Sequence, residues 1–212
     1  MAHRNMTARD MSLEESDVLP FPAHRESQRT ICVFCGSSPG AKPVYAQAAR
    51  EFGRSLGENG YRLVFGGGGI GLMGEVARAA RDAGAPVIGI LPAFLRSLEP
   101  PLKSAEELIV TPDLQQRKAR MLALADAFVI LPGGLGTLDE YFEVITTTQL
   151  RVHAKPIIVV NVEGYFDPLK TLLDRVVEQG FARMEIASYH EFVATPAEAI
   201  ERLKHLLHAR AL

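Results

Sequence analysis

The sequence is poor in several features that mark specialised classes of protein. Among its 212 residues there are only two cysteines, too few for a disulfide-stabilised scaffold. Acidic and basic residues nearly balance, with a net charge of −2, so we expect no general nucleic-acid binder. No apolar run approaches the roughly 18–20 residues that a membrane-spanning helix needs. We therefore expect a cytoplasmic enzyme or small-ligand binder, with no membrane and no nucleic acid as a partner.

Residues 1–29 form a segment of mixed charge, in which basic side chains are matched by acidic ones. No apolar stretch follows the first methionine, which argues against a secretory signal, and the acidic residues argue against an organelle presequence. We expect a flexible N-terminal extension over residues 1–29, followed by a single domain over residues 30–212.

From Thr30 onward, short apolar segments alternate with segments of helical periodicity. We expect strands over residues 30–35, 62–65, 86–91, 108–111, 127–131, 156–160 and 191–194. We expect helices over residues 44–58, 72–83, 114–125, 137–150, 168–179 and 196–209. Short apolar strands separated by helices are typical of a parallel sheet covered on both faces. The sequence therefore predicts an α/β, Rossmann-like, doubly wound fold with a mainly parallel sheet.

Three loops of glycine and small polar residues follow predicted strands. They span residues 36–40, 66–71 and 132–136. In a doubly wound sheet, ligands bind beyond the carboxyl ends of the strands, where the strand order reverses. Topology alone therefore makes these three loops candidates for a binding site.

The first glycine-rich motif is GGGGIGLMG over residues 66–74. Between a strand and a helix, such a motif favours close approach of the backbone to a phosphate or nucleotide. A dinucleotide site would place an acidic residue about 20 positions further on, but residues 88–92 read Ile-Gly-Ile-Leu-Pro. No Gly-Lys-Ser/Thr follows, which excludes a P-loop. A tight turn without a ligand remains the alternative.

The second motif is LPGGLGTLDE over residues 131–140. Its glycines leave backbone N–H groups free to face an anion, and the Thr137 hydroxyl adds a donor, so a phosphate fits there. Glu140 follows Thr137 by three residues, a spacing that also fits a capping box. Both interpretations can hold together, because a capping glutamate in the first turn still faces the cleft.

A basic cluster, QQRKAR over residues 115–120, opens the predicted helix that follows the 108–111 strand. Such a cluster is usually a solvated helix face. This helix, however, begins at the presumed ligand edge of the sheet and carries its apolar side further along. An arginine there can hold Glu140 or a substrate phosphate.

Cys32 and Cys35 have the spacing Cys-x-x-Cys but lie in a predicted strand. Their odd separation puts the side chains on opposite faces, and no second cysteine pair exists to complete a zinc site. We interpret them as small packing residues. His205 and His208 share a helix face without the carboxylate spacing of a metal site. We expect no metal and no cofactor.

In combination, these motifs resemble those of the LOG family. The resemblance rests on Cys-Gly-Ser-Ser at residues 35–38, the 66–74 loop, Arg117-Lys118 and the 132–140 segment, and it covers roughly residues 30–200. LOG proteins are cytokinin riboside 5′-monophosphate phosphoribohydrolases, often mislabelled lysine decarboxylases. The resemblance implies a Rossmann-like homodimer. It also implies hydrolysis of the N-glycosidic bond of a nucleoside 5′-monophosphate, such as AMP or isopentenyladenosine monophosphate, to free base and ribose 5-phosphate.

The resemblance also implies roles for individual residues. The family's catalytic arginine and glutamate fall on Arg117 and Glu140. Its nucleotide-contacting positions fall on Glu99, Arg117, Lys118, Gly133, Gly134, Leu135, Gly136, Thr137, Leu138, Asp139 and Thr146. The sequence departs from the family's pattern at residues 114–115, where Met-His is common, and at residues 146–150, where Thr-Trp-Ala-Gln-Leu is common. Both departures lie where base recognition can be tuned.

The chemistry of such a reaction suggests how the two catalytic residues act. An N-glycosidic bond breaks through an oxocarbenium-like transition state, positive on the sugar and negative on the departing base. Glu140 would stabilise the sugar and orient or deprotonate water. Arg117 would stabilise charge instead of donating a proton, because a guanidinium is too weak an acid to give its proton to the departing base. A phosphate on the Gly133–Thr137 loop would supply the binding energy that fixes the sugar.

Three alternatives stay open from the sequence. The first is a general purine or pyrimidine 5′-nucleotide nucleosidase, and the second is a non-catalytic nucleotide- or cofactor-binding module of the same fold. The third, a pyridoxal-phosphate lysine decarboxylase, is the weakest, because no lysine lies in a loop arranged for a Schiff base with a recognisable partner.

Overall fold

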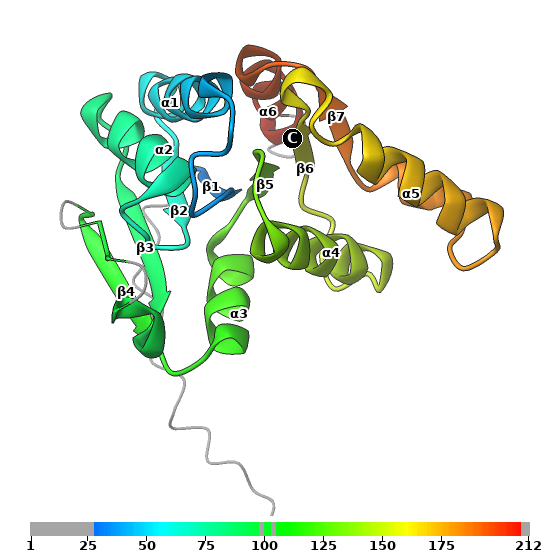
Figure 1. The fold of residues 1–212 in the computed structure, drawn as a ribbon, viewed down its shortest axis with the longest axis horizontal. Coiled ribbons are helices and arrows are strands. Elements are labelled where there is room, and N and C mark those ends of the chain that lie inside the picture. Colours follow the sequence, from blue (N-terminus) through cyan, green and yellow to red (C-terminus); the bar gives the residue numbers. More distant parts are fainter. Residues whose placement is uncertain (1–27, 98–99, 103–104, 209–212) are drawn as a thin grey trace, which may run out of the picture.

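The computed structural model describes residues 28–97, 100–102 and 105–208 (Figure 1). Its centre is a seven-stranded parallel sheet with the order β4-β3-β2-β1-β5-β6-β7. The strands are β1 (Thr30–Phe34), β2 (Arg62–Phe65), β3 (Val87–Pro92), β4 (Glu107–Thr111), β5 (Ala127–Ile130), β6 (Ile157–Val160) and β7 (Glu191–Val193). The order reverses between β1 and β5, so the switch point lies beyond the carboxyl ends of these two strands.

Helices cover both faces of the sheet. They are α1 (Pro43–Glu58), α2 (Gly71–Asp82), α3 (Leu114–Leu124), α4 (Leu135–Gln149), α5 (Asp167–Glu178) and α6 (Pro196–His208). Buried residues of α1, α2 and α6 form one hydrophobic cluster, and those of α3, α4 and α5 form a second. Short 3-10 helices, which the sequence did not predict, are η2 (Ala93–Ser97), η3 (Val162–Gly164) and η4 (Met184–Ser188). The predicted doubly wound α/β fold is thus confirmed.

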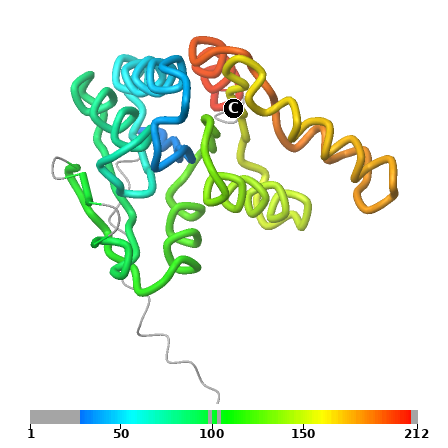
Figure 2. The backbone as a smooth tube through the Cα atoms, viewed as in Figure 1, coloured from blue at the N-terminus to red at the C-terminus, as the bar shows by residue number. Residues whose placement is uncertain are grey.

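The chain builds the sheet outward from β1 in two directions. In Figure 2 the tube runs through β1 to β4 in its blue and green part, then returns to place β5, β6 and β7 on the other side of β1. Strands β1, β3, β5 and β6 are buried along their whole length, as the continuous apolar segments predicted. The core therefore consists of two apolar layers, one on each side of the sheet.

The two cysteines pack on opposite faces of the sheet, as their separation predicted. Cys32 belongs to the layer under α3, α4 and α5, and Cys35 belongs to the layer under α1, α2 and α6. Both are free thiols, and burial raises the pKa of each. A thiol held protonated in the core is a packing residue and a poor nucleophile or metal ligand.

The segment predicted as an extension, residues 1–29, lies outside the described residues except for its last two. Gln28 Nε2 donates to the Gly60 carbonyl at 2.9 Å, and Arg29 Nη1 lies 3.2 Å from Asp126 Oδ1. Across the described ranges, no helix combines the length and apolarity needed to cross a membrane. In the same ranges, no group of three or more histidine, cysteine or acidic side chains is arranged to hold a metal ion.

Candidate active site

The loops that follow β1, β2 and β5 meet at the carboxyl edge of the sheet. The Gly36 N–H donates to the Pro132 carbonyl at 3.1 Å, and the Met73 N–H donates to the Gly36 carbonyl at 3.2 Å. Gly71 has a φ of +58°, and a Cβ there would overlap the backbone of Ser37. The three loops predicted from topology are therefore in contact with one another at the switch point, which confirms their common location.

Helix α4 begins two residues before its predicted start, because two glycines shape its first turn. Gly133 has no room for a side chain, since a Cβ would stand 2.7 Å from Thr137 Cβ and 2.8 Å from the Gly36 nitrogen. Gly134 is the N-cap, with extended backbone and no side-chain cap, and Leu135 is the first helical residue. The uncapped N–H groups of this turn suit an anion.

The capping-box interpretation of Thr137 and Glu140 is wrong. With Gly134 at the N-cap, Thr137 lies inside the first turn of α4, and no side chain caps the helix. Thr137 is buried against Gly133, which is why the glycine is needed there. Glu140 consequently lies one turn further along, where its carboxylate faces α3 instead of the end of its own helix.

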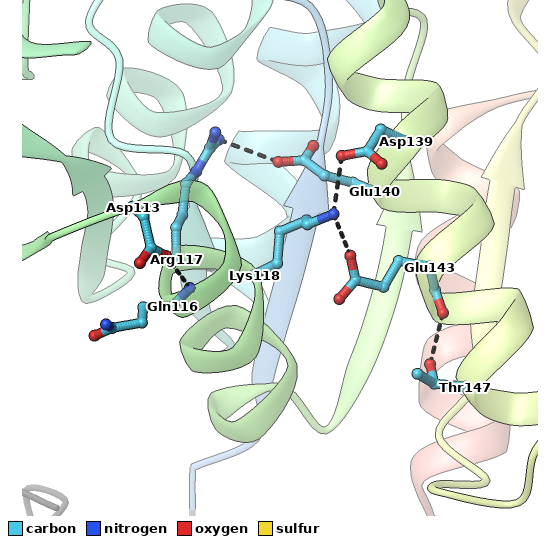
Figure 3. Close-up of polar contacts among 8 residues, drawn as sticks. All are labelled: Asp113, Gln116, Arg117, Lys118, Asp139, Glu140, Glu143 and Thr147. Carbon is cyan, nitrogen blue, oxygen red and sulfur yellow. Dashed lines mark hydrogen bonds and ion pairs between the residues drawn. The ribbon is translucent and has the colours of Figure 1, made fainter. Parts of the chain in front are cut away.

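Arg117 from α3 and Glu140 from α4 form an ion pair across the gap between the two helices (Figure 3). Arg117 Nη2 lies 3.1 Å from Glu140 Oε1, and the side chains are only 11% and 9% exposed. Low exposure strengthens the electrostatic interaction, because water screens it little. Asp113 caps α3, the helix that carries this arginine, since its carboxylate accepts from the Gln116 N–H at 2.7 Å.

The first glycine loop leaves space for the Arg117 guanidinium. A Cβ on Gly66 would overlap Arg117 Nη2 and would stand 3.3 Å from Arg117 Cζ. The loop over residues 66–74 thus has a role that neither of its sequence interpretations contained. Because Gly66 has no side chain, the guanidinium of Arg117, which comes from a helix more than 40 residues further along the chain, can occupy this position.

Lys118 fastens α3 to α4 beside this pair. Its ammonium lies 3.0 Å from Asp139 Oδ2 and 2.5 Å from Glu143 Oε2 (Figure 3). The hydrogen bond with Glu143 is the main reason that the pKa of Lys118 is raised, and Asp139 adds to it. Sequence reasoning missed Glu143, although its spacing from Asp139 and Glu140 on one helix places all three side chains toward α3.

The remaining predicted site residues lie at different distances from this centre. Residues 133–139 form the loop and first turn of α4, with Leu135 86% exposed at the rim. Thr146 is exposed on α4, about 9 Å along the helix axis from Glu140, at about 1.5 Å per residue. Glu99 lies outside the described residues. The structure therefore brings together Arg117, Lys118 and the start of α4, and leaves Thr146 apart from them.

The fold and this site define a class: a Rossmann-like protein with an uncapped, glycine-shaped helix start and a buried arginine–glutamate pair at the switch point. Residues 73–203 match the family model described as possible lysine decarboxylase. A probable cytokinin riboside 5′-monophosphate phosphoribohydrolase of Oryza sativa is 44% identical over 176 residues, which are 83% of this chain and 72% of that protein. A cytokinin riboside 5′-monophosphate phosphoribohydrolase of Arabidopsis thaliana is also 44% identical over 176 residues, which are 83% of this chain and 82% of the relative. The chain therefore belongs to the LOG family.

A solved structure supports the fold independently. The molybdenum cofactor carrier protein of Chlamydomonas reinhardtii superposes with a TM-score of 0.67 at 23% identity. The match covers 85% of this chain and 99% of the carrier protein. At this identity the likeness concerns the fold alone, because one fold hosts many functions.

Proposed function

We propose that the protein hydrolyses the N-glycosidic bond of cytokinin nucleoside 5′-monophosphates and releases the free base and ribose 5-phosphate. The observation that carries this proposal is the buried Arg117–Glu140 pair, set beside the uncapped start of α4. The names of relatives at 44% identity support the same reaction. No metal or cofactor takes part in the steps below.

The geometry accommodates the reaction in a simple sequence of steps. The phosphate binds the N–H groups at the start of α4, which fixes the sugar next to Glu140. As the bond between C1′ and the base breaks, its electron pair leaves with the base, and the Glu140 carboxylate stabilises the positive sugar. Glu140 accepts the proton of the water that attacks C1′, and the departing base takes up a proton from solvent. Arg117 holds the carboxylate in place and stabilises negative charge.

The rim of the site favours a base that carries an apolar substituent. Ile70, Leu114 and Leu135 are large apolar residues at the N-terminal ends of α2, α3 and α4, exposed by 44%, 44% and 86%. Parallel strands place these helix starts at the same edge of the sheet. An isopentenyl group adds apolar surface that these side chains can bury, and the adenine of AMP lacks that group. We therefore rank isopentenyladenosine monophosphate above AMP, and a general nucleosidase as the second candidate.

The free thiols of Cys32 and Cys35 suit a reducing compartment, and we infer that the protein acts in the cytoplasm. We infer also that it acts as a homodimer, as membership of the family suggests. Four exposed apolar side chains offer surface for a subunit contact: Leu150, Val152, Phe181 and Met184. Sedimentation equilibrium tests the dimer, and a monomer at micromolar concentration would contradict it.

The replacement Glu140→Gln tests the proposed reaction. We expect loss of base release by about 10²–10⁴-fold, because the amide can neither accept the proton of water nor balance the sugar's charge. Binding of AMP, measured by calorimetry, should remain. Free base is measured by chromatography for AMP, isopentenyladenosine monophosphate and adenosine. Glu75→Gln is the matched control, because it removes the carboxylate of an arginine–glutamate pair in α2 that lies outside the site.

The outcomes separate the candidates. A retained rate in Glu140→Gln would mean that another residue carries the chemistry. Binding without release of base from any nucleotide by the unaltered protein would favour a non-catalytic module. Comparable turnover of adenosine and AMP would contradict the role given to the phosphate, and equal rates across many bases would favour the general nucleosidase.

A further inference from the structure

The glycine loop before α4 is held by a side chain from a distant turn. The Tyr165 hydroxyl donates to the Gly133 carbonyl at 2.5 Å, across 32 residues of sequence. The ring of Tyr165 is fixed on two sides by edge-on aromatic contacts. Its centroid lies 5.5 Å from that of Tyr45 in α1 and 4.9 Å from that of Phe166. Tyr165 is therefore a positioned donor, even though it is partly exposed.

The turn that presents Tyr165 is built with unusual backbone conformations. Glu163 and Gly164 have φ values of +48° and +73°, although a non-glycine residue rarely adopts a positive φ. Asn161 fastens the turn, because its Oδ1 accepts from the Phe166 N–H at 2.7 Å. Lys42 Nζ, from the residue before α1, lies 2.7 Å from Glu163 Oε2. The loop after β1 and the loop after β6 are thus tied together beside the glycine loop.

The carbonyl that Tyr165 holds determines the direction of an N–H group. The Gly133 carbonyl and the Gly134 N–H belong to one planar trans peptide, so they point in opposite directions. A peptide between two glycines can rotate with little steric resistance. When the hydroxyl fixes the carbonyl, the Gly134 N–H is fixed on the opposite side, at the N-cap of α4.

We propose that Tyr165 is a positioning residue for phosphate binding. By holding the Gly133 carbonyl it keeps the Gly134 N–H turned toward the anion site, so that the helix start is ready for the 5′-phosphate before the nucleotide arrives. This inference rests on the proposed function, because it assigns the anion site to the phosphate of the same substrate. It extends that function to a residue outside the family motif of α4.

The replacement Tyr165→Phe keeps the ring and removes the hydroxyl. The net value of one hydrogen bond predicts Kd values for AMP and ribose 5-phosphate that rise about three- to tenfold. The KM for the nucleotide should rise by the same factor while kcat stays within about twofold, because the N–H contact to the phosphate is made equally in the bound nucleotide and in the transition state. Cleavage of adenosine, which lacks the phosphate, should not change. Tyr45→Phe is the matched control, since Tyr45 Oη has no hydrogen bond that involves the described residues.

A second variant distinguishes positioning from direct contact. Gly134 has a φ of −93°, and a Cβ there would meet nothing within 4 Å, so Gly134→Ala fits the observed peptide orientation. Rotation of the peptide would move φ of residue 134 into the left-handed region, which alanine disfavours. The effect of Tyr165→Phe on the Kd of ribose 5-phosphate should therefore shrink to less than about twofold in the Gly134→Ala background.

The results that overturn the inference differ from those that overturn the function. An unchanged Kd in Tyr165→Phe, or an equal loss in both backgrounds, would overturn the positioning role. Equal losses for adenosine and AMP would do the same, because they would indicate general disturbance. If the unaltered protein neither binds ribose 5-phosphate nor cleaves nucleotides, the proposed function has failed instead. Thermal unfolding of each variant confirms that it is folded.

Discussion

Gly66 is the residue whose replacement separates the function of the site from the stability of the fold. A Cβ at this position would stand 2.9 Å from Met73 Sδ and 3.3 Å from Arg117 Cζ, and closer still to Arg117 Nη2. Both neighbours are the ends of flexible side chains, and the φ of Gly66 is not positive. The fold can therefore absorb the methyl group of Gly66→Ala, and we expect the free energy of unfolding to change by less than about 1 kcal/mol.

The guanidinium of Arg117, by contrast, has to move from the space that the methyl group takes. Its 3.1 Å contact with Glu140 is then lost or lengthened. Since a misplacement of about 1 Å at a catalytic centre commonly costs about 10²-fold, we expect kcat/KM for nucleotide cleavage to fall by about that factor. The variant should therefore be folded, nearly as stable as the unaltered protein, and largely inactive.

Gly53→Ala is the matched control, because it crowds the same fold at a place without chemistry. A Cβ on Gly53 would stand 3.0 Å from the carbonyl carbon of Val76 and 3.1 Å from Ala79 Cβ, where α1 packs on α2. The backbone of Val76 is fixed in α2 and cannot rotate away as the end of a side chain can. We therefore expect a loss of about 1–3 kcal/mol in stability and a nearly normal kcat/KM. Urea unfolding followed by circular dichroism, together with chromatography of the released base, measures both quantities. Full activity in folded Gly66→Ala would refute the reasoning, as would a stability loss equal to that of Gly53→Ala.

Two other changes test the surroundings of the site and of the core. Lys118→Met leaves the carboxylates of Asp139 and Glu143 without their shared cation, so it should lower stability by about 0.5–1 kcal/mol and reduce kcat, measured by urea unfolding and base release; unchanged values would mean that α3 and α4 are held without it. Burial lowers the pKa of His190 in the folded state. Its stabilising neutral form is therefore lost in acid, and stability should decline as the pH falls from the usual histidine pKa of about 6.5 toward the lower folded value. Urea unfolding between about pH 5 and pH 7 should show a shallower decline in His190→Phe, and equal slopes would contradict this assignment.

The elements of the fold were predictable because their signals are local. Each predicted strand and helix exists, with its described ends within two residues of the predicted bounds, since burial on one face or on both leaves a direct periodic pattern. The order of the strands was not encoded in that way. The pairing of β1 with β5 joins Ile31 to Ala127, and only general rules of parallel sheets pointed to it.

The site was predictable in part, for the same reason. Motif spacing placed Arg117 and Glu140 at the ligand edge, but the local pattern of Thr137 and Glu140 also suggested a capping box, which the two glycines before α4 override. The contact between Tyr165 and Gly133 had no local signal. It depends on a turn in which Glu163 adopts a left-handed conformation, and the neighbouring residue types do not predict that conformation for a glutamate.

The burial of Arg117 and Glu140 itself argues for a chemical role. Removing two charges from water costs several kcal/mol per ion, and apolar residues of similar size often serve a core as well or better. This pair also requires a glycine at position 66 to leave space for the guanidinium, and Arg117 Nε has no hydrogen-bond partner among the described residues. Burying this pair costs desolvation free energy, requires a glycine at position 66 and leaves one donor unsatisfied. Stabilisation of two helices is therefore a poor explanation for it. Its place at the switch point, beside the uncapped start of α4, is explained if the two charges are kept for a transition state that itself separates charge.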